Sequence, residues 1–336
     1  MVMRVDMLGV SLAMAGLLVA ARAGPRFAGT LTALLLCTAA VFTKQTLVSA
    51  GIAVAVLAVW RAPRVGLAAI GVAGGAGVAA VAAVAAVAAW TAGGFLHNIV
   101  GYNINRFGWQ YVGAVFRLER PRAPFALLIG MAAVHAARRA ASSWTIRLLV
   151  LHFGVTTAVL IATSIKSGGN FNYLIEWLAS GTVLLGLLLI ELVRRGQSMR
   201  PVLIAVLGAM AVAVAAQPLR QVGSLVAPGD EAAQDRLVGL IMAANRPVAS
   251  ENMTLLMRAG RPILFEPSIV AELAVVGRWD EAPLVRMIEQ HGFAFVVVAD
   301  DLPGPGPRRS PAVDAALRAA YPHIAPCGPE LWLRTE

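Results

Sequence analysis

Long apolar runs follow one another over the first two thirds of this 336-residue chain, and they constrain its fold more than any other feature. A helix that crosses a bilayer needs about 20 mostly apolar residues, within a range of about 17–25. Eight segments approach this requirement, at 7–22, 27–43, 46–60, 65–91, 123–137, 146–165, 172–193 and 201–217. Only 14% of the residues are charged, whereas soluble domains carry about 25%. We therefore predict a polytopic α-helical membrane protein with about eight transmembrane helices.

The remainder of the chain has a different character, because 14 of the 18 acidic residues fall in 218–336. We predict a transmembrane domain over 1–217 and a small soluble α/β domain over 218–336. Apolar alternation predicts strands at 246–252, 261–267, 293–300 and 330–335, and helical periodicity predicts helices at 281–292 and 310–321. Ser310 and Pro311 fit the N-cap and first position of the last helix.

Arginine placement predicts the orientation in the membrane. The loops after the first, third, fifth and seventh segments carry ten arginines, which are Arg22, Arg26, Arg61, Arg64, Arg138, Arg139, Arg147, Arg194, Arg195 and Arg200. The short loops on the other side carry only Lys44 and Lys166. By the positive-inside rule the arginine-rich side is cytoplasmic, so the N-terminus, both lysines and the C-terminal domain lie outside.

The net charge of +10 does not indicate nucleic-acid binding, because the arginines are scattered at the ends of apolar runs and form no single basic face. The long loop 94–122 adds aromatic residues between amides, and we interpret them as interfacial anchors. Cys37 and Cys327 are far apart, which argues against a disulfide framework. A need for a divalent metal stays open, and no other cofactor is expected.

Two polar motifs on the outer side are the candidate binding residues. One is FTKQT, with Lys44 and Gln45, and the other is KSGGNFNYLIE, which contains Lys166, Asn170, Asn172, Tyr173 and Glu176. Lysine, backbone amides and a helix N-terminus suit a phosphate, and amide, phenol and carboxylate groups suit sugar hydroxyls. Glu176 falls about one helical turn inside the membrane boundary, where a carboxylate is a functional hypothesis by default.

A structural interpretation of the same residues stays open. Asn170 can cap the following helix, Lys44 can snorkel from a solvated turn, and Glu176 can pair with Lys44 or Lys166. His97, His135 and His152 stand alone in the sequence, and we expect them to be structural. In the tail, Glu251, Glu266, Asp280 and Asp300 are expected to be loop and cap residues.

The order MRVDMLGVSLAMAGL, FTKQT, GGNFNYLIE, SENMTLLMRAGRPILFEP and GRWDEAPLVRMIEQ resembles a bacterial family of the GT-C superfamily of membrane glycosyltransferases. Within that superfamily it is similar to the protein mannosyltransferase and aminoarabinose-transferase group, the family 39 type, and the resemblance spans nearly the whole chain. It implies a protein of the bacterial inner membrane that transfers a hexose or pentose from a polyprenyl-phosphate donor at the outer face. The implied partners are that donor and membrane lipids, with the acceptor unassigned.

One departure from the GT-C pattern bears on catalysis. GT-C enzymes carry a catalytic acidic residue in the first outer loop, and this chain begins at a point that resembles the middle of the family's first half. Asp6 lies in the family's arginine–aspartate segment, outside that loop. We therefore expect an N-terminally truncated form, and we assign no catalytic residue. Two alternatives stay open: a lipid-linked sugar transporter or flippase, and a non-catalytic accessory protein.

Overall fold

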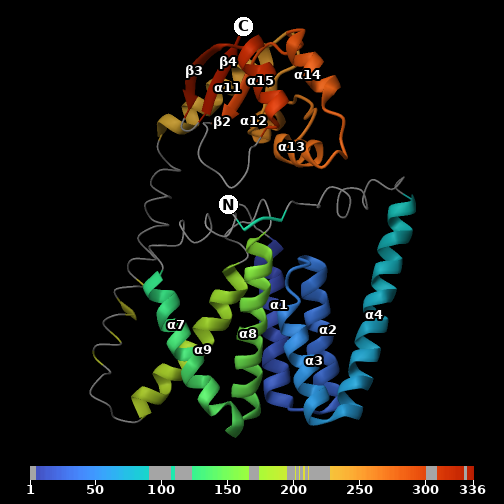
Figure 1. Ribbon diagram of the computed structural model, residues 1–336, viewed down its shortest axis with the longest axis vertical. Coiled ribbons are helices and arrows are strands. Elements are labelled where there is room, and N and C mark those ends of the chain that lie inside the picture. The colour runs from blue at the N-terminus through green and yellow to red at the C-terminus, as the bar shows by residue number, and fades with distance from the viewer. Residues whose placement is uncertain are drawn as a thin grey trace. The chain divides into compact units, whose positions relative to one another are not determined.

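The computed structural model describes residues 5–90, 107–109, 123–165, 174–194, 228–299, 309–328 and 331–336, with a few single positions between 201 and 211. These residues belong to two compact units, a helical unit in the first 206 residues and a second unit toward the C-terminus (Figure 1). Each unit is described by itself. The predicted boundary at 217/218 lies outside the described residues.

The described part of the helical unit is built from α-helices. These are α1 (Val5–Ala23), α2 (Phe27–Thr43), α3 (Ser49–Arg61), α4 (Pro63–Trp90), α7 (Ala123–Arg139), α8 (Trp144–Ser164) and α9 (Leu174–Arg194), with the 3-10 turn η3 (Ala140–Ser142) before α8. Short turns join α1 to α2, α2 to α3 and α3 to α4. The helices coincide with seven of the eight predicted segments. The eighth, 201–217, lies almost wholly outside the described residues.

Four of these helices are long and apolar enough to cross a membrane: α1, α4, α8 and α9. Helices α2 and α3 are apolar but shorter, with 17 and 13 residues, and α7 also has 17 residues. The described residues thus support a helical membrane protein in which four helices have the length and composition of a membrane span, fewer than the eight that the sequence predicts.

Close helix packing in this unit depends on small residues. A Cβ added at Gly16 of α1 would lie 2.8 Å from Cys37 Sγ and 2.9 Å from the Ala33 carbonyl oxygen, both on α2. A Cβ at Gly181 of α9 would lie 2.5 Å from Ile129 Cγ2 on α7. Small residues allow helix backbones to approach in lipid, where van der Waals packing drives association.

Local signals set the helix ends. Gly24 follows α1 with φ +63° and donates its N–H to the Ala20 carbonyl, which is the left-handed cap that glycine forms most easily. Pro63 begins α4, where its missing N–H costs nothing. Ser143 caps α8, and its hydroxyl accepts from the Ile146 N–H at 3.5 Å.

The second unit has a four-stranded sheet in the order β1-β2-β4-β3. Its strands are β1 (Ala249–Ser250), β2 (Val296–Ala299), β3 (His323–Gly328) and β4 (Leu331–Thr335). β1 and β2 are parallel, and the other two pairings are antiparallel, with an irregularity between Pro326 and Gly328. The described part of the unit also contains five helices: α11 (Pro228–Ala243), α12 (Met253–Arg258), α13 (Pro267–Val275), α14 (Ala282–Glu289) and α15 (Pro311–Ala320).

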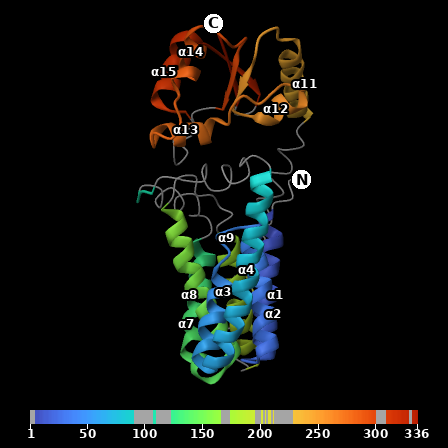
Figure 2. The ribbon, with the colours of Figure 1, turned by 90° about the vertical axis from the view of Figure 1, so that its right-hand side faces the viewer.

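Helices cover both faces of this sheet (Figure 2). Val296 and Val298 of β2 belong to a core with α14 and α15, whereas Val297 belongs to a second core with α11 and α12. This alternation follows from the two-residue period of a strand. Connecting the parallel strands β1 and β2 requires a crossover, and α12, α13 and α14 supply it.

Most elements predicted for this unit are confirmed. Short strands lie within 246–252, 293–300 and 330–335, helices lie within 281–292 and 310–321, and Ser310 caps α15 by accepting from the Val313 N–H at 3.2 Å. The strand predicted at 261–267 is wrong. Pro262 and Pro267 bracket it and donate no backbone hydrogen bond, and Glu266 begins a helix as its N-cap. Helices α11, α12 and α13 and strand β3 were not predicted.

Candidate functional site

The structure describes three of the seven predicted binding residues. Lys44 and Gln45 lie in the turn between α2 and α3, and Glu176 lies in the first turn of α9. The other four, Lys166, Asn170, Asn172 and Tyr173, lie outside the described residues. The proposed gathering of all seven in one site therefore stays a prediction.

Glu176 is buried among three helices, with 4% of its surface exposed. Its Oε2 accepts from the Ser49 hydroxyl of α3 at 3.3 Å, and its Oε1 lies 3.2 Å from Nε2 of His152 on α8. Both partners are fully buried. Lys44 pairs with Asp6 and not with Glu176, since the Ser49 hydroxyl and the His152 imidazole satisfy the Glu176 carboxylate. The alternative pairing of Glu176 with Lys166 lies outside the described residues.

His152 continues the network on its other side. Its Nδ1 lies 3.0 Å from the Ser180 hydroxyl on α9, one helical turn after Glu176. With the ring proton on Nε2, the imidazole donates to Glu176 and accepts from Ser180. Thr156 donates to the His152 backbone carbonyl at 2.7 Å. His152, which stands alone in the sequence, thus gains two side-chain partners when the helices pack.

Ser180, His152 and Glu176 are connected in the order hydroxyl, imidazole and carboxylate, as in a hydrolytic triad. Their burial nevertheless argues against hydrolysis. Ser180 is 1% exposed and His152 is fully buried, so the hydroxyl has no route to a substrate in this arrangement. The network instead joins α3, α8 and α9 by hydrogen bonds. In lipid, unsatisfied polar groups are costly, so these groups fix the relative register of the three helices.

Lys44 forms an ion pair at the end of the bundle where α1 begins. Its Nζ lies 2.7 Å from Asp6 Oδ1, and their side chains are 16% and 7% exposed. Lys44 caps the end of α2 and Asp6 lies in the first turn of α1. Ser49, which donates to Glu176, begins α3 five residues after Lys44. The Asp6–Lys44 pair and the Glu176 network therefore both involve residues that flank the turn between α2 and α3.

The arginine-rich end has its own contacts. The Trp144 indole N–H donates to the Ala20 carbonyl at 3.0 Å, and the Arg147 guanidinium lies 4.9 Å from the centre of the Trp60 ring. These contacts bring together the end of α1, the end of α3 and the start of α8. Nearby in the sequence, His135 and Arg139 bind Glu191, so His135 also does not stand alone. The arginines at the ends of α1, α3 and α7 and in the first turn of α8 therefore share one end of the bundle, whereas Arg195 and Arg200 lie outside the described residues.

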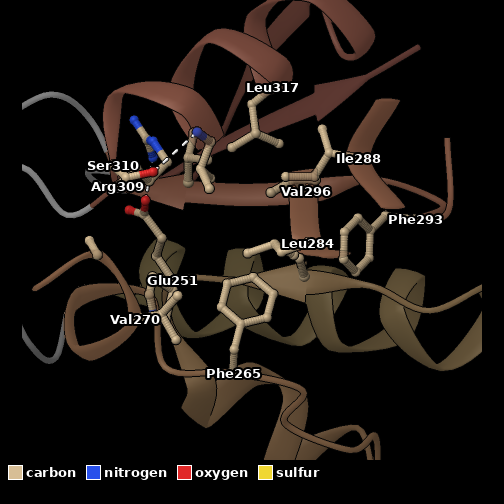
Figure 3. Close-up of a pocket in the computed structure, with 15 residues that line it drawn as sticks. Glu251, Phe265, Val270, Leu284, Ile288, Phe293, Val296, Arg309, Ser310 and Leu317 are labelled. Carbon is tan, nitrogen blue, oxygen red and sulfur yellow. Dashed lines mark hydrogen bonds and ion pairs between the residues drawn. The ribbon is translucent and has the colours of Figure 1, made fainter. Parts of the chain in front are cut away.

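In the α/β unit a small apolar cavity lies between the sheet and α13, α14 and α15 (Figure 3). Phe265, Leu284, Phe293 and Val296 are among its lining residues, and the Glu251–Arg309 ion pair lies at one side. Its volume of about 30 Å³ accommodates water but no sugar. Glu266 and Asp280 accept backbone N–H bonds as caps, as expected, whereas Glu251 pairs with Arg309.

Two further observations bound the chemistry. Within the described ranges, no three His, Cys, Asp or Glu side chains are grouped closely enough to hold a metal ion. Comparisons of the chain with family models, with curated proteins and with solved structures found no match. The function must therefore be argued from the residues themselves.

Proposed function

We propose that this protein binds a polyprenyl-phosphate-linked sugar at the arginine-poor end of its helical unit, and that it acts there as a glycosyltransferase of the bacterial inner membrane. The observation that carries the proposal is the Asp6–Lys44 pair. An ammonium group at the membrane boundary attracts a lipid phosphate, and the carboxylate partner holds it in place until that phosphate arrives.

The electrostatics of the pair support a binding role more than a catalytic one. Asp6 is almost fully buried and bound to Lys44, so it is poorly placed to take a proton from an acceptor hydroxyl. Lys44 is the more exposed partner and presents donors that a phosphate oxygen can share. In this proposal Gln45, which is exposed beside it, and the KSGGNFNYLIE motif contact the sugar and phosphate.

The orientation belongs to the same proposal. The ends of α1, α3 and α7 carry arginines, and in this proposal that end of the unit is cytoplasmic, following the positive-inside rule. Lys44 and Asp6 then face the outside, where polyprenyl-linked sugars are used. The C-terminal α/β unit lies outside as well if the segment at 201–217 crosses the membrane.

One observation favours the alternative of a lipid-linked sugar transporter. His152 is eight residues from the start of α8 and twelve from its end. At 1.5 Å per residue, it lies about 12 Å from the first residue of α8 and about 18 Å from the last. Polar groups near mid-depth are typical of transporters. The helices around it are nevertheless continuous in the described residues, which favours a structural network.

The test uses the full chain in proteoliposomes with a polyprenyl-phosphate-linked hexose and a polyprenyl-phosphate-linked pentose, each labelled in the sugar. The variant is the double substitution Asp6→Asn with Lys44→Gln, which removes both charges together. Its matched control is Arg22→Gln, a charge removal at the other end of α1. We expect the double variant to lower donor binding at least tenfold and the control to leave it unchanged.

The products distinguish the two functions. Release of free polyprenyl phosphate, with the labelled sugar bonded to a hydroxyl of an acceptor added to the vesicles, supports the transferase, whereas movement of the intact donor between leaflets supports the transporter. Equal donor binding by the wild type and the double variant would overturn the role of Lys44 in both cases. Absence of any donor binding by the wild type would overturn the proposed function itself.

A further inference from the structure

The α/β unit exposes large apolar side chains on one group of elements. Nine such residues occur in its described part, and eight of them lie on α11, α12, α13 and the segments that join α12 to α13 and follow α13. The eight are Leu240, Met242, Met257, Ile263, Leu264, Ile269, Val275 and Val276. The ninth, Ile324, lies on strand β3. This uneven distribution singles out one face of the unit.

Arg261 holds the elements of this face together. Its guanidinium donates to the backbone carbonyls of Ile241, Met242 and Ala244 at the end of α11. Arg258 of α12 also binds Asp235 of α11. Both ribbon views place α12 and α13 along one edge of the unit, with α14 toward the opposite edge (Figures 1 and 2). The apolar residues therefore belong to neighbouring elements.

The inner side of the 263–276 segment is already occupied by the fold. Phe265, Pro267, Val270 and Ala271 line the small cavity against the sheet and α15 (Figure 3). Leu264, by contrast, is 50% exposed, and Ile263, Ile269, Val275 and Val276 are exposed too. The segment thus has an inner side packed into the fold and an apolar outer side, and an exposed apolar surface of this kind marks a protein or membrane interaction site.

The chain itself indicates what covers this outer side. The α/β unit follows, on the same polypeptide, four described helices that are long and apolar enough to cross a membrane. A bilayer that these helices cross is held near the unit at a high effective concentration. Arginines outnumber acids in 257–278, with Arg258, Arg261 and Arg278 against Glu266 and Glu272, so the segment carries a small net positive charge that suits an anionic lipid surface. Of the acids there, Glu266 binds the Ile269 N–H as the N-cap of α13.

We propose that the face formed by α12, α13 and the residues 259–266 between them lies in the membrane interface, with Ile263, Leu264 and Ile269 inserted among the lipid headgroups. This contact orients the α/β unit on the bilayer that its own helices cross. It depends on membrane attachment alone and is independent of the proposed sugar transfer.

The experiment labels the full chain with a nitroxide in vesicles of phosphatidylethanolamine and phosphatidylglycerol. Cys327 is replaced by serine, and the buried Cys37 is retained. Labels are then placed one at a time through Leu264→Cys, Ile269→Cys and, as the matched control, Ile324→Cys, which is 49% exposed in the native chain. Collision with oxygen, which concentrates in lipid, is compared with collision with a water-soluble nickel chelate.

We expect labels at 264 and 269 to collide at least threefold more with oxygen than with nickel, relative to the label at 324. Equal profiles at all three positions would show a water-exposed face and would overturn the proposal. Protection of 264 and 269 from both reagents would also overturn it, because another protein surface would then cover the face. All three positions are exposed, so the labels are compatible with folding.

Discussion

Nε2 of His152 lies 3.2 Å from Oε1 of Glu176, and both side chains are buried between α8 and α9. This contact connects two helices that the sequence presents as separate apolar segments. Each residue is unusual in its apolar segment, because one is a histidine and the other a carboxylate, and in the structure each provides the other's hydrogen-bond partner.

We predict that His152→Ala destabilises the helical unit. The substitution removes one hydrogen-bond partner from the Glu176 carboxylate and one from the Ser180 hydroxyl. A buried polar group left unsatisfied lowers the free energy of unfolding by about 1–3 kcal/mol. The measurement is the thermal unfolding temperature of the full chain in detergent micelles. The control, His135→Ala, removes a histidine whose side chain is 36% exposed. An equal effect of the two substitutions would contradict the assigned burial of the network.

The Asp6–Lys44 pair predicts strong non-additivity. Lys44→Met alone removes the ammonium group that pairs with the buried Asp6 carboxylate, and breaking a buried pair in this way costs about 3–5 kcal/mol. Adding Asp6→Asn removes that charge, so we expect the double variant to be more stable than the single one. Unfolding of the two single variants and the double variant gives the coupling energy. Simple addition of the single effects would show that the pair does not form.

Tyr321 of the α/β unit is expected to make stability sensitive to alkaline pH. Its buried hydroxyl accepts from the Phe293 N–H at 3.1 Å and donates to the Phe293 carbonyl at 3.0 Å. Burial raises the pKa of the Tyr321 phenol, with a smaller contribution from the Glu336 carboxylate. Because the folded pKa is above the unfolded value of about 10, this stabilisation is complete below about pH 10 and is lost as pH rises through the folded pKa.

The corresponding variant is Tyr321→Phe, which keeps the ring and removes both hydrogen bonds. We expect it to be less stable at neutral pH by about 1–3 kcal/mol and to lose less stability than the wild type above pH 10. Chemical denaturation followed by near-ultraviolet circular dichroism at several pH values measures both effects. Parallel pH profiles for the two proteins would contradict the role of the phenol.

Asp314 is expected to make the stability of the α/β unit sensitive to acidic pH. Burial by itself would raise the pKa of its carboxyl, but the hydrogen bond and charge of Arg318 and the charge of Arg309 outweigh it and lower that pKa. A lowered folded pKa gives stability that is present above the unfolded value of about 3.9 and is lost as pH falls through the folded pKa. Asp314→Asn should therefore flatten the stability profile below pH 4, with Asp235→Asn, on a carboxylate whose side chain is 66% exposed, as the control.

The apolar runs could be located from the sequence because a membrane helix needs a continuous stretch of suitable side chains, and seven predicted segments coincide with helices. Their depth in the membrane was harder to predict. The short helices α2 and α3 show that an apolar composition predicts a helix but does not predict whether that helix is long enough to cross the membrane. Capping signals such as Ser310 before Pro311 were readable because they act within one turn.

The partners of the polar residues were decided by tertiary structure. Sequence spacing places Glu176 and Ser180 on one side of α9, and the single histidine in an apolar segment was a visible signal. Nothing local relates either to Ser49, which is 127 positions away from Glu176. Hydrogen bonds between helices depend on packing and register, which arise from contacts across the whole unit. The sequence by itself therefore determined the membrane class, most helix positions and the change in character after Gln217, whereas the pairing of Asp6 with Lys44 and of His152 with Glu176 was determined only when the helices packed.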